Sequence, residues 1–218
     1  HNPDPDRWPN GLDEIRGYGL VSVSALPGYR AGGRFWRKVA DAGGRIDFPL
    51  VPWALGEEFT FLHASDTHVS EQSVPRMRRL REIVEARRPA FVLMSGDLVR
   101  DALRVGEAEA RGDYDLFLRE IATFRVPVWT VPGNHEIFGI ERHLSLVNPT
   151  HPLYGKAMYR ELLGPDYYSF NAGDIHFVGL NTVDVDDLWY YGHVDETQLA
   201  WLGRDLSFLP AGATVVTF

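Results

Sequence analysis

Three short segments of the sequence combine side chains that bind metal ions through oxygen and nitrogen. They are Ser65–His68 (SDTH), Ser95–Asp97 (SGD) and Gly133–Glu136 (GNHE). A carboxylate and an imidazole two residues apart, as at Asp66 and His68, can both reach one metal ion from a loop. Oxygen and nitrogen donors without sulfur suit zinc, manganese or iron. The chain has no cysteine, which excludes disulfides, thiolate zinc sites, iron–sulfur clusters and cysteine nucleophiles.

Taken singly, each segment also has a purely structural interpretation. Asp66 suits the N-cap of a following helix, Gly96-Asp97 suits a turn, and Gly133–His135 is a run of turn formers. The position of the segments argues against that interpretation for all three together. Each follows directly after an apolar run, and the glycines before Asp97 and Asn134 allow a sharp backbone turn beside a cluster.

The apolar runs predict the strands that must position these segments. The runs cover Phe59–Ala64, Phe91–Met94 and Val128–Val131, and two more follow at His176–Leu180 and Thr214–Phe218. Near-continuous apolar sequence is typical of strands that are covered on both faces. In an open α/β sheet, the carboxyl ends of the strands form one edge, where ligands bind. We therefore expect the three segments to meet at one rim of a sheet.

Helical patterns alternate with these runs. The predicted helices are Val74–Arg88, Asp113–Phe124, Ala157–Leu163 and Asp195–Leu209. The last of them opens with a capping-box pattern, because Gln198 stands three residues after Asp195. Alternating strands and helices predict a layered α/β fold. The stretch from Gly139 to Asn171 is long and rich in His, Tyr and Pro, which favours a functional loop.

The beginning of the chain follows a different pattern. Residues 1–19 carry several prolines and glycines and predict an extended arm. Short strands and a turn are expected at Leu20–Ser24, Arg34–Val39, Gly43-Gly44 and Ile46–Val51. We therefore divide the chain into residues 1–57, an arm with a small β segment, and residues 58–218, the layered α/β domain in which we expect the chemistry to lie.

The set of motifs resembles the calcineurin-like metallophosphoesterases. That family carries Asp-x-His, then Gly-Asp, then Gly-Asn-His-Asp/Glu, which match Asp66–His68, Gly96-Asp97 and Gly133–Glu136 here. Gly173–Thr182 is similar to the family's next strand, and the resemblance covers roughly Phe59 to the end. The segment before Glu58 is similar to part of a small β domain found in some bacterial members. The resemblance implies a four-layer αββα sandwich around two metal ions.

The resemblance also implies a role for each site residue. Asp66 and His68 would bind one metal ion, Asp97 would bridge both, and Asn134 would bind the second. The two ions, divalent or of mixed valence, would be manganese, zinc or iron, and a hydroxide between them would attack the phosphoester. His135 would be no ligand but would face the phosphoryl group and assist the leaving oxygen. Asp97 and His135 are thus the expected catalytic residues, and Asn134 and His135 are expected to contact substrate.

Two departures from the family pattern alter these expectations. Members carry two further histidine motifs, whereas here Thr214–Phe218 ends the sequence. We therefore expect the sandwich to lack its C-terminal part and the metal site to be incomplete, with this strand in the same sheet and its end facing Asp97. Purple acid phosphatases have Tyr where this chain has Arg100 and lack the histidine present here as His68, so that branch is not expected. Arg100, with Arg104, is a candidate clamp for phosphate.

The remaining histidines and aromatic residues have structural interpretations. His63 and His176 lie within predicted strands and suit packed, hydrogen-bonded histidines. Three others, His143, His151 and His193, lie in or near long loops. Trp189–Tyr191 either forms a wall of the pocket or covers an edge of the core.

Composition limits the partners. The chain of 218 residues has 22 Lys and Arg against 30 Asp and Glu, a net charge of −8, which disfavours binding to a nucleic-acid backbone. No apolar run approaches the ~18 residues that span a bilayer, and the start lacks the regions of a signal peptide. We expect a small-molecule or lipid phosphoester as substrate, with compartment and oligomeric state left open. Two alternatives also stay open: a nuclease of the same superfamily, and a non-catalytic binding module with an incomplete metal site.

Overall fold

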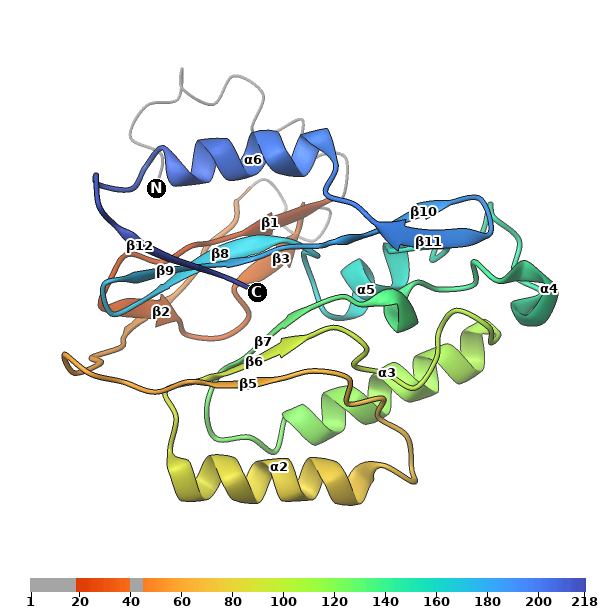
Figure 1. Ribbon diagram of the computed structural model, residues 1–218, viewed down its shortest axis with the longest axis horizontal. Helices are drawn as coiled ribbons and strands as arrows, with labels where there is room; N and C mark the ends of the chain where they lie inside the picture. Colours follow the sequence, from red (N-terminus) through yellow and green to blue (C-terminus); the bar gives the residue numbers. More distant parts are fainter. Residues whose placement is uncertain (1–18, 40–44) are drawn as a thin grey trace.

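Two three-stranded sheets pack face to face, with helices on their outer faces (Figure 1). The computed structural model describes residues 19–39 and 45–218. Helix α6 (Glu196–Leu206) covers one sheet, and helices α2 (Val74–Arg87) and α3 (Glu107–Ile121) cover the other. The predicted four-layer αββα sandwich is therefore confirmed.

The first sheet holds the strands that lead into the three predicted segments. Its order is β5 (Leu62–Ala64), β6 (Val92–Ser95) and β7 (Val128–Val131), and all three strands are parallel. In β6, Val92 and Met94 belong to the core beneath α2 and α3, whereas Leu93 belongs to the core between the sheets. Burial of both faces explains why the run Phe91–Met94 is apolar at every position.

The second sheet receives the last strand of the chain, contrary to our expectation. Its order is β12 (Thr214–Thr217), β9 (Ile175–Gly179) and β8 (Tyr168–Ala172). Strand β12 pairs with β9 in parallel, so it lies opposite the sheet in which we predicted it. The prediction was wrong because an apolar run shows that a strand is buried but not which sheet edge accepts it.

Aromatic side chains fill the space between the two sheets. Trp129 stacks on Phe170 with ring centroids 4.1 Å apart, and Phe170 stacks on Phe177 at 5.1 Å. Phe91 is fully buried among them and meets Phe177 edge to face at 5.1 Å. Such rings contribute large buried areas with defined relative orientations, which fixes how one sheet lies on the other.

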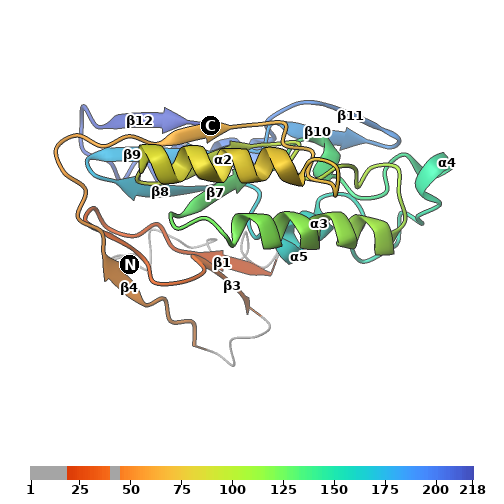
Figure 2. The same cartoon turned by 90° about the horizontal axis from the view of Figure 1, so that it is seen from below.

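The N-terminal β segment packs on one side of this sandwich (Figure 2). It consists of two short antiparallel pairs, β1 (Leu20–Ser22) with β3 (Trp36–Lys38) and β2 (Tyr29–Ala31) with β4 (Leu50–Pro52). Phe35 and Trp53 pack against the core between the sheets. The arm predicted over residues 1–19 lies outside the described residues except for Gly19, and so does the turn predicted at Gly43-Gly44. The boundary after residue 57 stays a prediction.

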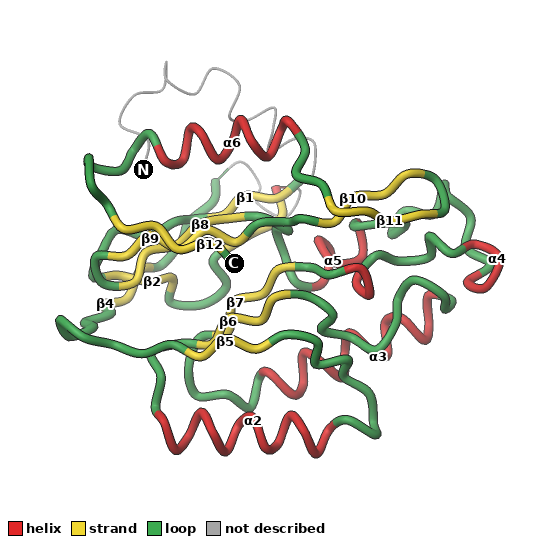
Figure 3. Tube along the Cα trace, in the orientation of Figure 1, coloured by secondary structure: helices red, strands yellow, loops and turns green. Residues whose placement is uncertain are grey.

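The stretch from Gly139 to Asn171 holds more regular structure than the single helix predicted there (Figure 3). It contains α4 (Arg142–Ser145), α5 (Ala157–Leu162) and most of β8. A hairpin of β10 (Val183–Asp186) and β11 (Trp189–Gly192) follows the second sheet.

Helix α3 begins at Glu107 instead of the predicted Asp113, because the first turns are anchored by the fully buried Ala110. Among the described residues, no helix has the length and apolar character to cross a membrane.

Candidate metal centre

The three predicted segments meet at one edge of the first sheet, joined by backbone hydrogen bonds. Asp66 and His68 follow β5, Asp97 follows β6, and Asn134 lies in the short 3₁₀ helix η3 (Asn134–Glu136) after β7. The His68 N–H donates to the carbonyl of Asp97 at 2.9 Å. Two further hydrogen bonds continue this link across the strand ends. The Asp66 N–H donates to the carbonyl of Gly96 at 3.2 Å, and the Gly96 N–H donates to the carbonyl of Val131 at 3.0 Å. The loops therefore form one connected unit.

Three of the proposed metal ligands have left-handed backbone conformations. The φ angles are 53° at Asp66, 39° at His68 and 49° at Asp97. Residues other than glycine seldom adopt this region, at a cost of about 1–3 kcal/mol each, and such residues gather at functional sites. The surrounding hydrogen bonds hold these angles, so the orientation of the three side chains is set by the fold.

Two glycines allow the loops after β6 and β7 to come this close. A Cβ atom on Gly133 would stand 2.3 Å from Asp97 Oδ1, and one on Gly96 would stand 2.9 Å from the Cα of Gly133. A side chain at position 133 would push the Asp97 carboxylate out of place, and one at position 96 would push the loop after β7 away. The glycines predicted to permit a sharp turn thus serve a close approach of two backbones.

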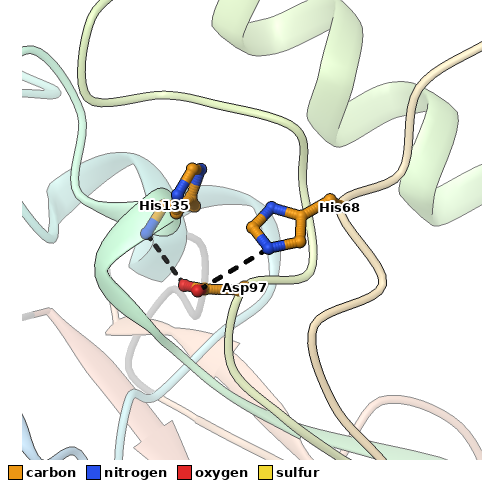
Figure 4. A group of neighbouring side chains, drawn as sticks. All are labelled: His68, Asp97 and His135. Atoms are coloured by element: carbon orange, nitrogen blue, oxygen red, sulfur yellow. Dashed lines mark hydrogen bonds and ion pairs between the residues drawn. The ribbon is translucent and has the colours of Figure 1, made fainter.

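His68, Asp97 and His135 form a group of donors that fits a metal ion (Figure 4). One ligand atom from each lies within 4.8 Å of the others, and His68 Nε2 stands 3.8 Å from Asp97 Oδ2. The two imidazole rings meet edge to face with centroids 4.5 Å apart. Two nitrogens and a carboxylate oxygen are donors that zinc, manganese and iron accept.

A hollow of about 210 Å³ lies beside this group. Asp66, Asp97 and Asn134 line it, together with Phe218 from the end of β12. Asp97 is the residue that the hollow and the histidine group share. The Asp66 carboxylate accepts a hydrogen bond from Ser65 Oγ at 2.5 Å and stands outside the group of His68, Asp97 and His135. The predicted approach of β12 to Asp97 is confirmed, although the strand belongs to the other sheet.

His135 is held through both its backbone and its ring. Its backbone N–H donates to Asp97 Oδ1 at 3.1 Å. The ring Nδ1 lies 2.6 Å from the carbonyl oxygen of Arg100, which can only accept, so Nδ1 carries the proton. Nε2 is then the ring atom left to accept or, after protonation, to donate a hydrogen bond to a ligand.

Glu136 is a functional residue whose role the sequence did not reveal. It is fully buried, and its Oε1 accepts hydrogen bonds from the N–H groups of Leu98 at 2.7 Å and Val99 at 2.9 Å. Its Oε2 accepts one from the N–H of Gly133 at 2.7 Å. One carboxylate therefore clamps the Asp97 loop to the Asn134 loop. The available signal was an acidic residue followed directly by the apolar Ile137 and Phe138.

Burial raises the pKa of Glu136 to about 7. Below its ordinary value of 4.5, both the folded and the unfolded chain hold the proton; between 4.5 and 7 only the folded chain does. Stability from this group is therefore full below about pH 4.5 and lost as the pH rises through 7, by up to about 3 kcal/mol. In metal-free protein, urea unfolding at pH 5, 6, 7 and 8 should show this decline for the native sequence but not for Glu136→Gln.

The matched control for this measurement is Glu85→Gln, an exposed glutamate of α2. Its unfolding free energy should follow that of the native protein at every pH. If the Glu136→Gln and native curves ran parallel from pH 5 to 8, the buried carboxyl would not be titrating in this range.

The structure gives Arg100 other partners than a substrate. Its guanidinium pairs with Glu109 and, at 3.4 Å from Nε to Oδ2, with Asp113, both in α3. Asp113 raises the pKa of this guanidinium, so its charge is already balanced locally. Arg104 is paired with Asp101 and Glu141. A phosphate clamp by Arg100 stays a prediction, and it requires the side chain to leave these carboxylates.

The other histidines lie away from the donor group. His176 is buried and bonded to Asn171 and Asp205, as expected of a structural histidine. His63 was expected to be packed, but it is exposed, with its ring 2.6 Å from Ser95 Oγ. The expected hydrogen bond is therefore present, but the expectation that His63 is packed was wrong, because β5 is an edge strand. His151 lies beside Glu107, and His193 lies beside Asp184.

The predicted aromatic cluster does not form a wall of the hollow. It consists of Trp189, Tyr190 and Tyr191, which are exposed on β11.

Comparisons with known proteins give a consistent picture. The family model described as "Calcineurin-like phosphoesterase" matches residues 59–214. A 3′,5′-cyclic-nucleotide phosphodiesterase from Nostoc sp. is 27% identical over 150 residues, covering 67% of this chain and 46% of that protein. The chain thus spans about half the length of this curated relative.

Two solved structures are similar over most of the chain. A dimetal phosphatase from Danio rerio is 19% identical with a TM-score of 0.49, covering 73% of this chain and 68% of that one. A purple acid phosphatase from yellow lupin seeds is 16% identical with a TM-score of 0.47, covering 72% of this chain and 29% of that one.

Proposed function

This chain belongs to the calcineurin-like phosphoesterase family, and from this premise we propose that it hydrolyses phosphoester bonds with two metal ions held at the edge of the first sheet. The observation that carries the proposal is the position of Asp97. Its carboxylate belongs both to the group with His68 and His135 and to the hollow lined by Asp66 and Asn134. A carboxylate with donors on two sides is suited to hold two cations and to offset their mutual repulsion.

In this proposal the donors divide between two metal ions. Following the family resemblance, Asp66 and His68 serve the first, Asn134 serves the second, and Asp97 serves both. His135 lies beside these ligands in the donor group but is not itself a ligand in this proposal. Metal ions at such a site lower the pKa of a bound water and withdraw charge from phosphoryl oxygens. The chain's own contribution is to fix the donors, through the clamp by Glu136 and the left-handed backbone at Asp66, His68 and Asp97.

His135 assists the leaving group in this proposal. The hydrogen bond from Nδ1 to Arg100 O orients the ring, and Nε2 is the atom that donates a proton or a hydrogen bond to the departing oxygen. A leaving alkoxide is strongly basic and needs this help, whereas a nitrophenolate leaves without it.

His135→Gln should therefore retain the metal ions and lose turnover. We expect kcat to fall about 10²- to 10⁴-fold on an alkyl phosphate and much less on p-nitrophenyl phosphate. Turnover on both substrates and metal content by elemental analysis should be measured together. The matched control is His143→Gln, an exposed histidine in α4, which should behave like the native protein. If kcat fell equally on both substrates, His135 would not assist the leaving group and would only help to position the substrate.

The cyclic-nucleotide phosphodiesterase among the relatives favours a phosphodiester as the physiological substrate. The experiment that tests the proposed function is an activity screen with added manganese, zinc or iron. It compares p-nitrophenyl phosphate, bis-p-nitrophenyl phosphate, 3′,5′-cyclic AMP and a phospholipid. We expect hydrolysis of at least one of these compounds. Activity on the cyclic nucleotide would support a phosphodiester as the physiological substrate. Metal binding without any turnover would favour the binding module, and cleavage of single-stranded DNA or RNA alone would favour the nuclease.

A further inference from the structure

A second cavity lies at the other end of strand β7 from the metal centre. Its volume is about 460 Å³, within the range of small-molecule sites. The N-terminal β segment contributes one wall, and the ends of α3 and α5 contribute another. In β7, Val128, Trp129 and Thr130 line this cavity, whereas Val131 lines the hollow of the metal centre. No residue lines both, so the two spaces are separate sites.

Three arginines and no acidic residue line this cavity. They are Arg30, Arg34 and Arg125. Among the described residues, none of the three takes part in an ion pair, while the Arg34 guanidinium lies 5.0 Å from the centre of the Trp36 ring. Three uncompensated cations around one concave space favour an anion, and guanidinium groups match the geometry of carboxylate, phosphate and sulfonate.

A buried donor on the same wall has no partner. Trp129 is 8% exposed, and its indole Nε1 is buried without a hydrogen-bond acceptor among the described residues. One face of the indole stacks on Phe170 at 4.1 Å, and Phe35 lies against it at 4.7 Å. Its faces are therefore engaged in the core, and only its N–H edge is unused. Trp129 therefore lines the cavity with a ring that the core holds in place, and its buried N–H has no acceptor among the described residues.

The remainder of the lining is largely apolar. Leu118, Ile121 and Phe124 come from α3 and the turn after it, and Leu162 and Leu163 come from the end of α5. We propose that this cavity binds a small amphiphilic anion, with its charged head on the arginines and its apolar body against these side chains and Trp129. This site is independent of the phosphoesterase reaction proposed above.

The test is a calorimetric titration of metal-free protein with 2-naphthalenesulfonate, which has an aromatic body and an anionic head. We expect saturable binding at one site per chain. The double variant Arg34→Ala/Arg125→Ala should weaken it at least about tenfold, because each charged hydrogen bond is worth that much. Arg78→Ala, an exposed arginine on α2, is the matched control and should leave the affinity unchanged. The neutral analogue 2-naphthylmethanol should bind at least about tenfold more weakly than the sulfonate.

A second measurement locates the ligand without relying on the arginine variants. In a nitrogen–proton NMR spectrum, the Trp129 indole signal, assigned by its absence in Trp129→Phe, should shift as the sulfonate is added. Asp97→Asn should bind the sulfonate with native affinity, which separates this site from the metal centre. The proposal is overturned if binding is not saturable, if the double variant binds as well as the native protein, or if the Trp129 signal does not move.

Discussion

Exhaustive chelation should abolish phosphoester hydrolysis by this protein, and manganese, zinc or iron should restore it. The proposed ligands are carboxylate, imidazole and amide groups at one sheet edge, and they include no sulfur. His68, Asp97 and His135 bring three potential metal donors together. Among the described residues, no other histidines and carboxylates form such a group of three.

The measurement pairs activity with elemental analysis of the same samples. Circular dichroism of the chelated protein serves as the control, because it shows whether the loss reflects unfolding instead of metal removal. Calcium, which prefers larger shells made only of oxygen ligands, should restore little activity. Full activity in a sample shown to be free of metal would disprove the metal-dependent mechanism.

Asp97→Ala should be the most damaging single substitution at the site. In the proposed arrangement this carboxylate serves two metal ions, whereas Asp66 serves one. Loss of both ions removes several kcal/mol of transition-state stabilisation, so activity should fall at least about 10³-fold. Metal stoichiometry should drop toward zero in Asp97→Ala and by about one ion in Asp66→Ala. Retention of both metal ions by Asp97→Ala would refute the bridging role.

An asparagine variant controls for backbone effects in this comparison. Asp97 and Asp66 have φ angles of 49° and 53°, a region that alanine tolerates poorly and asparagine tolerates well. Asp97→Asn keeps an oxygen that can accept the N–H of His135, and it removes only the charge. If Asp97→Asn loses the metals while its thermal unfolding matches the native protein, the loss belongs to the missing carboxylate and not to a damaged loop.

The arrangement of the proposed metal-binding edge could be predicted from the sequence because local patterns determine it. Each ligand segment stands next to an apolar run, and the parallel strands β5, β6 and β7 then carry the segments to the same edge. The alternation of apolar runs with helical patterns, together with the position of each segment at a strand end, predicts that Asp66, Asp97 and Asn134 lie around one point. All three line the same hollow. The αββα layering came from the family resemblance and not from these patterns.

Other features depend on contacts between distant segments, and no local pattern predicts them. The sheet that receives β12 is decided by pairing with β9. The exposure of His63 depends on β5 being an edge strand, and the pairing of Arg100 depends on where α3 lies. Glu136 appears in the sequence as the last residue of the Gly133–Glu136 motif, with no sign of what its side chain contacts. Its role follows only when two loops from different strands direct three backbone N–H groups at it.

The left-handed backbone at Asp66, His68 and Asp97 has a consequence for engineering this protein. Glycine at these positions would relieve about 1 kcal/mol of backbone strain each, so such variants gain thermostability as they lose metal ligands. A library selected only for resistance to heat would therefore become enriched in folded, inactive proteins. Selection for thermostability should either leave these three codons fixed or include a metal-dependent assay in every round.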